Sequence, residues 1–254
     1  MLAAERRRVI TERIKATGQV VVSALSTEFQ VSEETIRRDL EWLESQGIAS
    51  RIYGGAVLTG NDRIAPPYSV RKNTNIEPKL TIARQLAALV QDGDTLMVDE
   101  SSTAAYAVRA LAQKRNITLI TNSLELLREM NSQDSWHIIS TGGSIKHDVL
   151  AQVGPHALRT VGSYHARYAV LSCRGINDQL GLADSDDQVV QIKQAMVKAS
   201  DRAILLADHR KFDRTGLVAL GEISLVDTLI TDCLPSQEWQ SRLSDAGVRL
   251  LCGE

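Results

Sequence analysis

The chain has 254 residues, of which 43% are hydrophobic and 24% are charged, a balance that is ordinary for a globular protein of one large or two smaller domains. Its formal net charge of −2 excludes an overall basic field of the kind that marks many nucleic-acid binders. Three cysteines, an odd number, favour reduced thiols, and the lack of an apolar leader or a membrane-spanning run leads us to expect a cytoplasmic protein.

The N-terminal part of the chain predicts a helix-turn-helix. Residues 3–16 have helical spacing of apolar side chains, and Gly18 ends that helix. Residues 20–43 predict two further short helices joined by a tight turn, so that a helix-turn-helix covers about residues 20–39. Ser32 is a candidate N-cap of the second of these helices, since its hydroxyl can accept a hydrogen bond from a free backbone N–H.

The second of these helices has an apolar face and a polar face. The apolar side chains lie at i, i+4 and i+7: Ile36, Leu40 and Leu43. At about 100° of rotation per residue, Arg38 points away from them, flanked by Glu34, Thr35 and Arg37. Any amphipathic surface helix carries charges on its outer face, but after a tight turn this face is also suited to hydrogen bonds with DNA.

A β-wing is predicted after the second helix. An alternating strand, the turn at Gly54 and Gly55 and a short return strand form its pattern, so we expect Arg51 and Tyr53 to contact the DNA backbone or minor groove. Residues 1–58 hold eight basic and eight acidic side chains, for a balance of 8 − 8 = 0. DNA binding must therefore depend on local placement of charge and on dimerisation, and should be sensitive to salt.

The remaining chain predicts a linker and an α/β domain. Residues 59–78 contain three prolines and little apolar periodicity, which predicts a linker between a DNA-binding domain at 3–58 and a second domain at 79–254. Short apolar runs in the second domain predict strands at 95–99, 117–121, 136–140, 168–172, 203–207, 228–232 and 248–252. Helical patterns lie at 79–91, 103–114, 122–131, 187–200 and 236–246. This alternation indicates a mostly parallel sheet covered on both faces.

Polar residues follow the predicted strands, at the edge where ligands bind in such sheets. Hydroxyls at a helix start can cradle an anion, and paired glycines allow close backbone approach. The candidate residues are Asp99, Ser101, Ser102, Thr103, Thr121, Asn122, Ser123, Gly142, Gly143, Gly175, Asp208 and Lys211. Each motif alone has an ordinary structural explanation as an N-cap, a turn or a solvated side chain. Their recurrence at five successive strand ends favours a binding site.

Both halves of the chain resemble one family. The run Thr35-Ile36-Arg37-Arg38-Asp39-Leu40, followed by a glycine-rich wing, is similar to the N-terminal module of the DeoR family of bacterial transcription regulators. Five motifs of the second domain resemble the effector domain of that family. They are Asp99-x-Ser-Ser-Thr, Thr-Asn-Ser, Thr-Gly-Gly, residues 181–184 (Gly-Leu-Ala-Asp) with Lys193 after them, and Asp208-His209-x-Lys211-Phe212. That domain is related to ribose-5-phosphate isomerase and glucosamine-phosphate deaminase, and it senses sugar phosphates.

The resemblance implies roles for several residues. Residues 99–103 would hold the phosphate or the sugar hydroxyls, and Asn122, Gly142 and Gly143 would line the pocket. Asp184 belongs to the same set, and Lys193 and Lys211 would supply positive charge. Glu100 would repel a phosphate, so we expect its carboxylate to point away from the pocket.

The sequence is best interpreted as a transcription factor that represses a carbohydrate-utilisation operon and responds to a sugar phosphate. It would bind double-stranded operator DNA as a homo-oligomer, a dimer or a tetramer, with no membrane association, metal, cofactor or catalytic residue. One alternative is a sugar-phosphate isomerase or deaminase with a DNA-binding head, for which Asp99, Asp184 and Asp208 are candidate general bases. Another is a DNA-binding head on a purely oligomerising domain.

Overall fold

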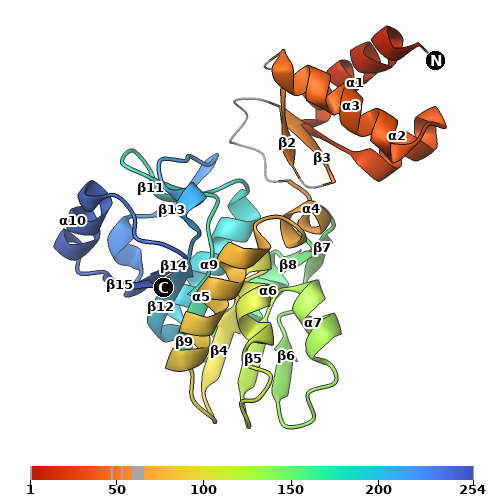
Figure 1. Cartoon of the computed structure of the whole chain (residues 1–254). Coiled ribbons are helices and arrows are strands. Elements are labelled where there is room, and N and C mark those ends of the chain that lie inside the picture. Colours follow the sequence, from red (N-terminus) through yellow and green to blue (C-terminus); the bar gives the residue numbers. More distant parts are fainter. Residues whose placement is uncertain (1, 47, 53, 59–65, 254) are drawn as a thin grey trace. The chain divides into compact units, whose positions relative to one another are not determined.

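The chain folds into two compact units, Met1–Thr74 and Asn75–Glu254. The computed structural model describes residues 2–46, 48–52, 54–58 and 66–253 (Figure 1). The predictions for Tyr53 on the wing and for linker residues 59–65 lie outside the described residues. Among the described helices, none is both long enough and apolar enough to cross a bilayer.

The first unit is a winged helix-turn-helix, as predicted. Its helices are α1 (Ala3–Thr17), α2 (Val22–Phe29) and α3 (Glu33–Ser45), and its strands are β1 (Gln19–Val21), β2 (Ala49–Ile52) and β3 (Gly55–Leu58). The strands form an antiparallel sheet in the order β1-β3-β2, with β2 and β3 as the wing hairpin. Ile36, Leu40 and Leu43 are buried in one core with residues of α1 and α2.

Local signals in the sequence set the ends of these helices. Gly18 adopts a left-handed conformation at the end of α1, with φ of 78°. Ser32 caps α3, because its hydroxyl oxygen accepts a hydrogen bond from the backbone N–H of Thr35 at 3.2 Å. Gln30 lies in the predicted short turn between α2 and α3, where its φ of 52° is left-handed.

A buried carboxylate joins α1 to α3. Asp39 accepts hydrogen bonds from Nε of Arg6 at 2.5 Å and from Nε of Arg7 at 2.8 Å, and its side chain is 2% exposed. The Arg7 guanidinium also lies over the Trp42 ring, 4.9 Å from its centroid. Because a buried charge is stable only when it is paired, these contacts fix which face of α3 is turned outward. The sequence motif contained Asp39 but gave it no role.

The described part of the predicted linker contains a short helix. This helix, α4 (Tyr68–Lys72), has buried side chains at Tyr68 and Val70. The next helix, α5 (Ile76–Leu89), begins three residues before residue 79.

The second unit is built on a seven-stranded parallel sheet within the described residues. The strands are β4 (Thr95–Val98), β5 (Thr118–Thr121), β6 (His137–Ser140), β9 (Ala166–Leu171), β12 (Ser200–Leu206), β14 (Thr228–Thr231) and β15 (Arg249–Cys252). They follow the order β15-β14-β12-β9-β4-β5-β6, and each neighbouring pair is parallel. The strand order reverses between β4 and β9, which is the switch point where ligands bind in such sheets.

Helices cover both faces of this sheet, as predicted (Figure 1). Alternate strand residues enter different cores, as the period of two in a strand requires. Leu96 and Val98 pack in one core with α5, α6 (Ser102–Arg109) and α7 (Leu124–Met130). Met97 packs in the other core with α8 (Pro155–Gly162), α9 (Asp187–Lys198) and α10 (Gln237–Asp245).

Several short elements were not predicted from the sequence. They are β7 (Ser144–Lys146), β8 (Ala151–Val153), β10 (Gly175–Asn177), β11 (Gly181–Asp184), β13 (Val218–Gly221), α8, and the 3-10 turns η1 (His209–Lys211) and η2 (Ile223–Leu225). Strands β10, β11 and β13 form a small antiparallel sheet, and β7 pairs with β8. Most of these short strands mix apolar residues with polar ones or glycine, so they lack the apolar runs that marked the strands of the main sheet.

The Asp39 contact makes a testable prediction. Asp39→Asn removes the charge that Arg6 and Arg7 share, and breaking a buried ion pair costs about 3–5 kcal/mol. Backbone hydrogen exchange in α1 and α3, measured by mass spectrometry, should speed up by about 100-fold or more. The control is Glu12→Gln, which removes an exposed ion pair with Arg8 on α1 and should change exchange by less than about threefold. Equal exchange in the two variants would contradict the prediction.

Candidate functional site

A buried ionic cluster lies at the carboxyl edge of the parallel sheet. Lys193 of α9 is 2% exposed, and its Nζ lies 2.6 Å from Asp184 Oδ2, 3.1 Å from Asp99 Oδ2 and 3.5 Å from Glu100 Oε1. The ammonium group also donates a hydrogen bond to the Ser172 carbonyl oxygen at 2.8 Å. We call Asp99, Glu100, Asp184 and Lys193 the Lys193 cluster.

The residues of the cluster come from three different parts of the fold. Asp99 follows β4, and its carboxylate accepts hydrogen bonds from the backbone N–H groups of Ser101 at 3.0 Å and Ser172 at 2.8 Å. Since Ser172 follows β9, Asp99 ties the ends of the two strands at the switch point. Asp184 reaches the cluster from the end of β11 in the small antiparallel sheet.

Three carboxylates therefore surround one ammonium group. Burial by itself lowers the pKa of Lys193, but Asp184, Asp99 and Glu100 together raise that pKa well above its usual value. Our expectation that Glu100 points away from the pocket was wrong, because its carboxylate faces Lys193 and accepts a hydrogen bond from Asn122 Nδ2 at 3.4 Å. Lys193 holds these carboxylates together, which is a different role from supplying unmatched positive charge to a phosphate.

The start of α6 lies next to the cluster in sequence and offers hydrogen-bond donors. Ser101 caps the helix, since its hydroxyl oxygen accepts a hydrogen bond from the backbone N–H of Ala104 at 3.1 Å. Ser102 and Thr103 are buried, and no side-chain hydrogen bond joins either hydroxyl to another residue in the described part of the chain. The first turn of a helix also presents free N–H groups and the positive end of its dipole.

Asn122 contains an unpaired acceptor. It is fully buried, and its Nδ2 donates to Glu100 and to the Gln152 carbonyl oxygen at 3.3 Å. Its Oδ1 has no hydrogen-bond partner among the described residues. Buried polar atoms are nearly always paired, so this unpaired oxygen is an exception in the packing of the domain. The neighbouring hydroxyls have structural roles. Thr121 donates a hydrogen bond to the Val98 carbonyl oxygen, and Ser123 caps α7 by accepting one from the backbone N–H of Leu126.

The Thr-Gly-Gly loop after β6 contacts a residue that the sequence did not indicate. Gln152 Oε1 accepts hydrogen bonds from the Ser140 hydroxyl at 2.7 Å, the Thr141 hydroxyl at 3.3 Å and the Gly142 N–H at 3.2 Å. Gln152 lies on β8, an element without a clear sequence signal. Gly143 has φ of 105°, and a Cβ there would lie 2.5 Å from the Val153 carbonyl oxygen, so this glycine serves close packing.

Three further predicted residues lie after β9 and β12. Gly175, the first residue of β10, permits close approach of the segment before β13, because a Cβ there would lie 2.2 Å from the Arg214 carbonyl oxygen. Asp208 caps η1 by accepting from the Arg210 N–H at 3.0 Å. Burial lowers the pKa of Lys211, while Asp208 opposes that shift. Burial also raises the pKa of the nearby Cys173 thiol to about 12, so Cys173 acts as a small apolar residue.

The predicted DNA-contacting side chains lie on α3 and on the wing. Arg37 donates to Glu33 at 2.6 Å, and Arg38 lies 3.6 Å from Glu34 with 74% of its side chain exposed. Arg51 on the wing donates to Glu41 and Glu44, and the hydrogen bond with Glu44 raises the pKa of this guanidinium. The Thr35 hydroxyl lies 2.9 Å from the Ser32 hydroxyl. Exposed ion pairs are weak, so DNA phosphates can replace these acids.

These two units define a class of protein. A winged helix-turn-helix presents exposed arginines on the outer face of its second helix. An α/β unit in the same chain gathers polar groups at the switch point of its sheet. Together they define a transcription regulator that carries a sensor domain.

Comparisons with known proteins identify the family. Residues 6–61 match the DeoR-like helix-turn-helix domain, and residues 74–233 match the DeoR C terminal sensor domain. The chain belongs to the DeoR family of transcription regulators, which confirms the resemblance recognised in the sequence.

The chain aligns with relatives over most of their length. The uncharacterized HTH-type transcriptional regulator YulB of Bacillus subtilis is 37% identical over 91% of this chain and 90% of its own length. The glycerol-3-phosphate regulon repressor of Escherichia coli is 32% identical over 99% of this chain and 100% of its own length.

Among solved structures, ribose 5 phosphate isomerase A from Neisseria gonorrhoeae aligns with 54% of this chain and 53% of its own, at 14% identity and a TM-score of 0.39.

The Lys193 cluster makes a prediction about stability. Lys193→Met leaves three buried carboxylates without their cation, so the free energy of unfolding should fall by about 3–5 kcal/mol. Urea denaturation followed by tryptophan fluorescence measures this change. Lys198→Met, on the exposed side of the same helix, should change the free energy by less than about 0.5 kcal/mol. The same loss in both variants would show that the cluster does not stabilise the domain.

Proposed function

We propose that this regulator represses a carbohydrate-utilisation operon and that a sugar phosphate, bound at the carboxyl edge of its α/β unit, controls its affinity for operator DNA. The observation that supports this most is the unpaired, buried Oδ1 of Asn122 beside the Lys193 cluster. An acceptor on a side chain that also contacts the Glu100 carboxylate is suited to the hydroxyl donors of a sugar. The name of the glycerol-3-phosphate regulon repressor supports the same ligand class.

The ligand has two chemically different ends, and the site offers two matching regions. The sugar hydroxyls would donate to Asn122 Oδ1 and to carboxylate oxygens of the Lys193 cluster. The phosphate would lie at the start of α6, where Ser102, Thr103 and the first-turn N–H groups are donors. Lys211 would add positive charge. In this arrangement the phosphate would lie away from the carboxylates of the Lys193 cluster, which would reduce the repulsion between the phosphate and the Glu100 carboxylate.

The DNA-binding unit would insert α3 into the major groove. Arg37 and Arg38 would divide phosphate and guanine contacts between them, with Ser32, Glu34 and Thr35 at the same end of the helix. Arg51 would contact the backbone from the wing. One small module binds DNA too weakly for a regulator, so we infer a dimer or tetramer that recognises half-sites spaced by turns of the double helix.

Sensing, rather than turnover, is the activity we propose for the α/β unit. Asp99 and Asp184 contact Lys193, and Asp208 accepts from the Arg210 N–H. These contacts support structural and ligand-binding roles for the three candidate bases. The rival enzyme hypothesis predicts isomerisation of ribose 5-phosphate or deamination of an amino-sugar phosphate by the purified protein, which a coupled assay would detect.

The sensor hypothesis is tested with operator DNA obtained by in-vitro selection and a panel of sugar phosphates. A coupling of about 1–3 kcal/mol between the two sites should change operator affinity about 5–150-fold for the matching ligand, as measured by fluorescence anisotropy. Thr103→Val should weaken the response to that ligand about 10–100-fold, because it removes a hydrogen bond to a charged phosphate. The control is Thr160→Val on α8, whose hydroxyl donates to the His156 carbonyl outside the site.

The outcome separates the hypotheses. If no sugar phosphate alters operator affinity or the melting temperature, the α/β unit is an oligomerising domain. A ligand at 100 times its dissociation constant adds about 2.7 kcal/mol of stability, so binding without a change in operator affinity would still be visible.

The orientation of α3 gives a second test. Arg38→Ala should weaken operator binding about 5–150-fold and relax the base preference at one position, because a guanine contact contributes about 1–3 kcal/mol. Arg159→Ala, an exposed substitution in the second unit with the same change of charge, should alter affinity by less than about twofold at fixed salt. Unchanged affinity in Arg38→Ala would mean that another face of the unit contacts DNA.

A further inference from the structure

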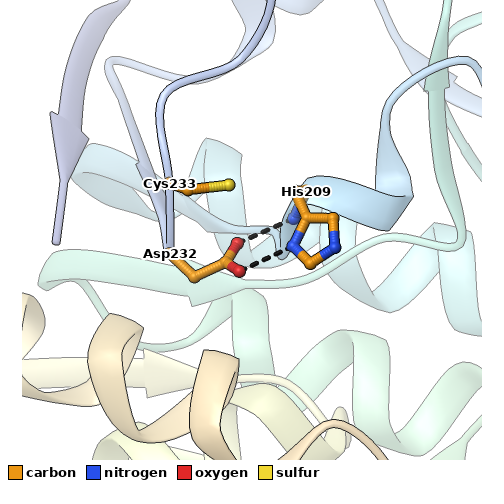
Figure 2. A group of neighbouring side chains, drawn as sticks. All are labelled: His209, Asp232 and Cys233. Atoms are coloured by element: carbon orange, nitrogen blue, oxygen red, sulfur yellow. Dashed lines mark hydrogen bonds and ion pairs between the residues drawn. The ribbon is translucent and has the colours of Figure 1, made fainter. Parts of the chain in front are cut away.

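A second group of side chains lies at the carboxyl edge of the sheet, outside the proposed effector pocket. His209 follows β12, and Asp232 and Cys233 follow the neighbouring parallel strand β14 (Figure 2). The imidazole Nδ1 of His209 and Oδ2 of Asp232 are 2.7 Å apart, and the backbone N–H of His209 donates to Asp232 Oδ1 at 2.7 Å. The Cys233 sulfur lies on the same side, and the three ligand atoms lie within 4.8 Å of one another.

We propose that His209, Asp232 and Cys233 form a binding site for a Zn²⁺-like divalent transition metal. An imidazole nitrogen, a carboxylate oxygen and a thiolate sulfur are a typical zinc ligand set, whereas Ca²⁺ and Mg²⁺ prefer oxygen ligands. The two strand ends hold the ligands on a rigid part of the fold. His209 and Cys233 are exposed, so a cation from solution can reach them.

The geometry needs only a small adjustment. Zinc–ligand bonds of about 2.0–2.3 Å at tetrahedral angles separate neighbouring ligand atoms by about 3.3–3.6 Å. The cation would replace the hydrogen bond between His209 and Asp232 and draw the sulfur inward. Three protein ligands leave a fourth position for water. Cys252, on the adjacent strand β15, is a nearby candidate for that position, because it pairs in register with Thr231 of β14.

A cation here would also steady the turn that contributes to the proposed effector pocket. His209 begins η1, and Lys211 ends it. A bond from the cation to His209 would therefore restrict the backbone that carries Lys211. The metal site itself does not depend on the sugar-phosphate hypothesis, since its ligands are different side chains.

The experiment uses the full chain, freed of metal with a chelator and kept reduced, and titrated with Co²⁺ as a spectroscopic substitute for Zn²⁺. We expect one Co²⁺ per chain, a thiolate-to-cobalt charge-transfer band and the visible bands of a four-coordinate site, all removed when Zn²⁺ is added. Cys233→Ser should remove the part of the charge-transfer band that comes from its thiolate, which is the whole band if water is the fourth ligand. His209→Gln should weaken Co²⁺ binding by about tenfold or more.

The matched control is His165→Gln. His165 and Asp201 form another exposed pair with 2.7 Å between Nε2 and Oδ1, and no cysteine belongs to it. This variant should bind Co²⁺ as the natural sequence does. Cys252→Ser distinguishes a fourth protein ligand, which would change the visible bands, from water, which would leave them unaltered. Absence of the charge-transfer band in the natural sequence, or an undiminished band in the double variant Cys233→Ser/Cys252→Ser, overturns the proposal.

Discussion

The α/β unit depends on the ion pairing of Lys193 with three buried carboxylates. Removing an ammonium group and carboxylates from water is costly, and only close mutual contacts recover that cost. The 2.6 Å and 3.1 Å contacts to Asp184 and Asp99, together with the Ser172 carbonyl, provide this compensation. They join α9, the small sheet and the ends of β4 and β9 into one polar centre. The same interaction therefore both stabilises the fold and arranges the polar groups of the proposed pocket.

The DNA-binding unit also contains a buried charge that is stabilised by ion pairs, but here two arginines surround one carboxylate. Asp39 is buried between Arg6 and Arg7, so α3 is held against α1 in one rotation. The exposed arginines of α3 and the wing are instead paired with exposed glutamates, whose contacts DNA phosphates can replace. This division explains how a segment with balanced charge can belong to a DNA-binding regulator: its buried ions set the shape, and its exposed ions remain available.

The carboxyl edge of the sheet carries both sites that we propose. Near the switch point, Asn122 Oδ1 and the start of α6 present groups suited to a polar, anionic small molecule. Further along, the ends of β12 and β14 bring together nitrogen, oxygen and sulfur ligands suited to a soft cation. Parallel strands place all their carboxyl ends at one edge, so a single sheet can hold both sites on rigid backbone.

The sequence by itself determined the features that repeat over short distances. Short apolar runs located the seven strands, helical spacing located α1 to α3, and alternation around Gly54 and Gly55 located the wing. The hydroxyl of Ser32 marked the start of α3. Contacts between distant residues were decided only by the tertiary structure. Lys193 meets Asp99 across 94 positions of the chain, Glu100 turns inward to Lys193, and Gln152 fills the loop after β6. No local pattern encodes these contacts, because the partners depend on strand order and on the balance of buried charge.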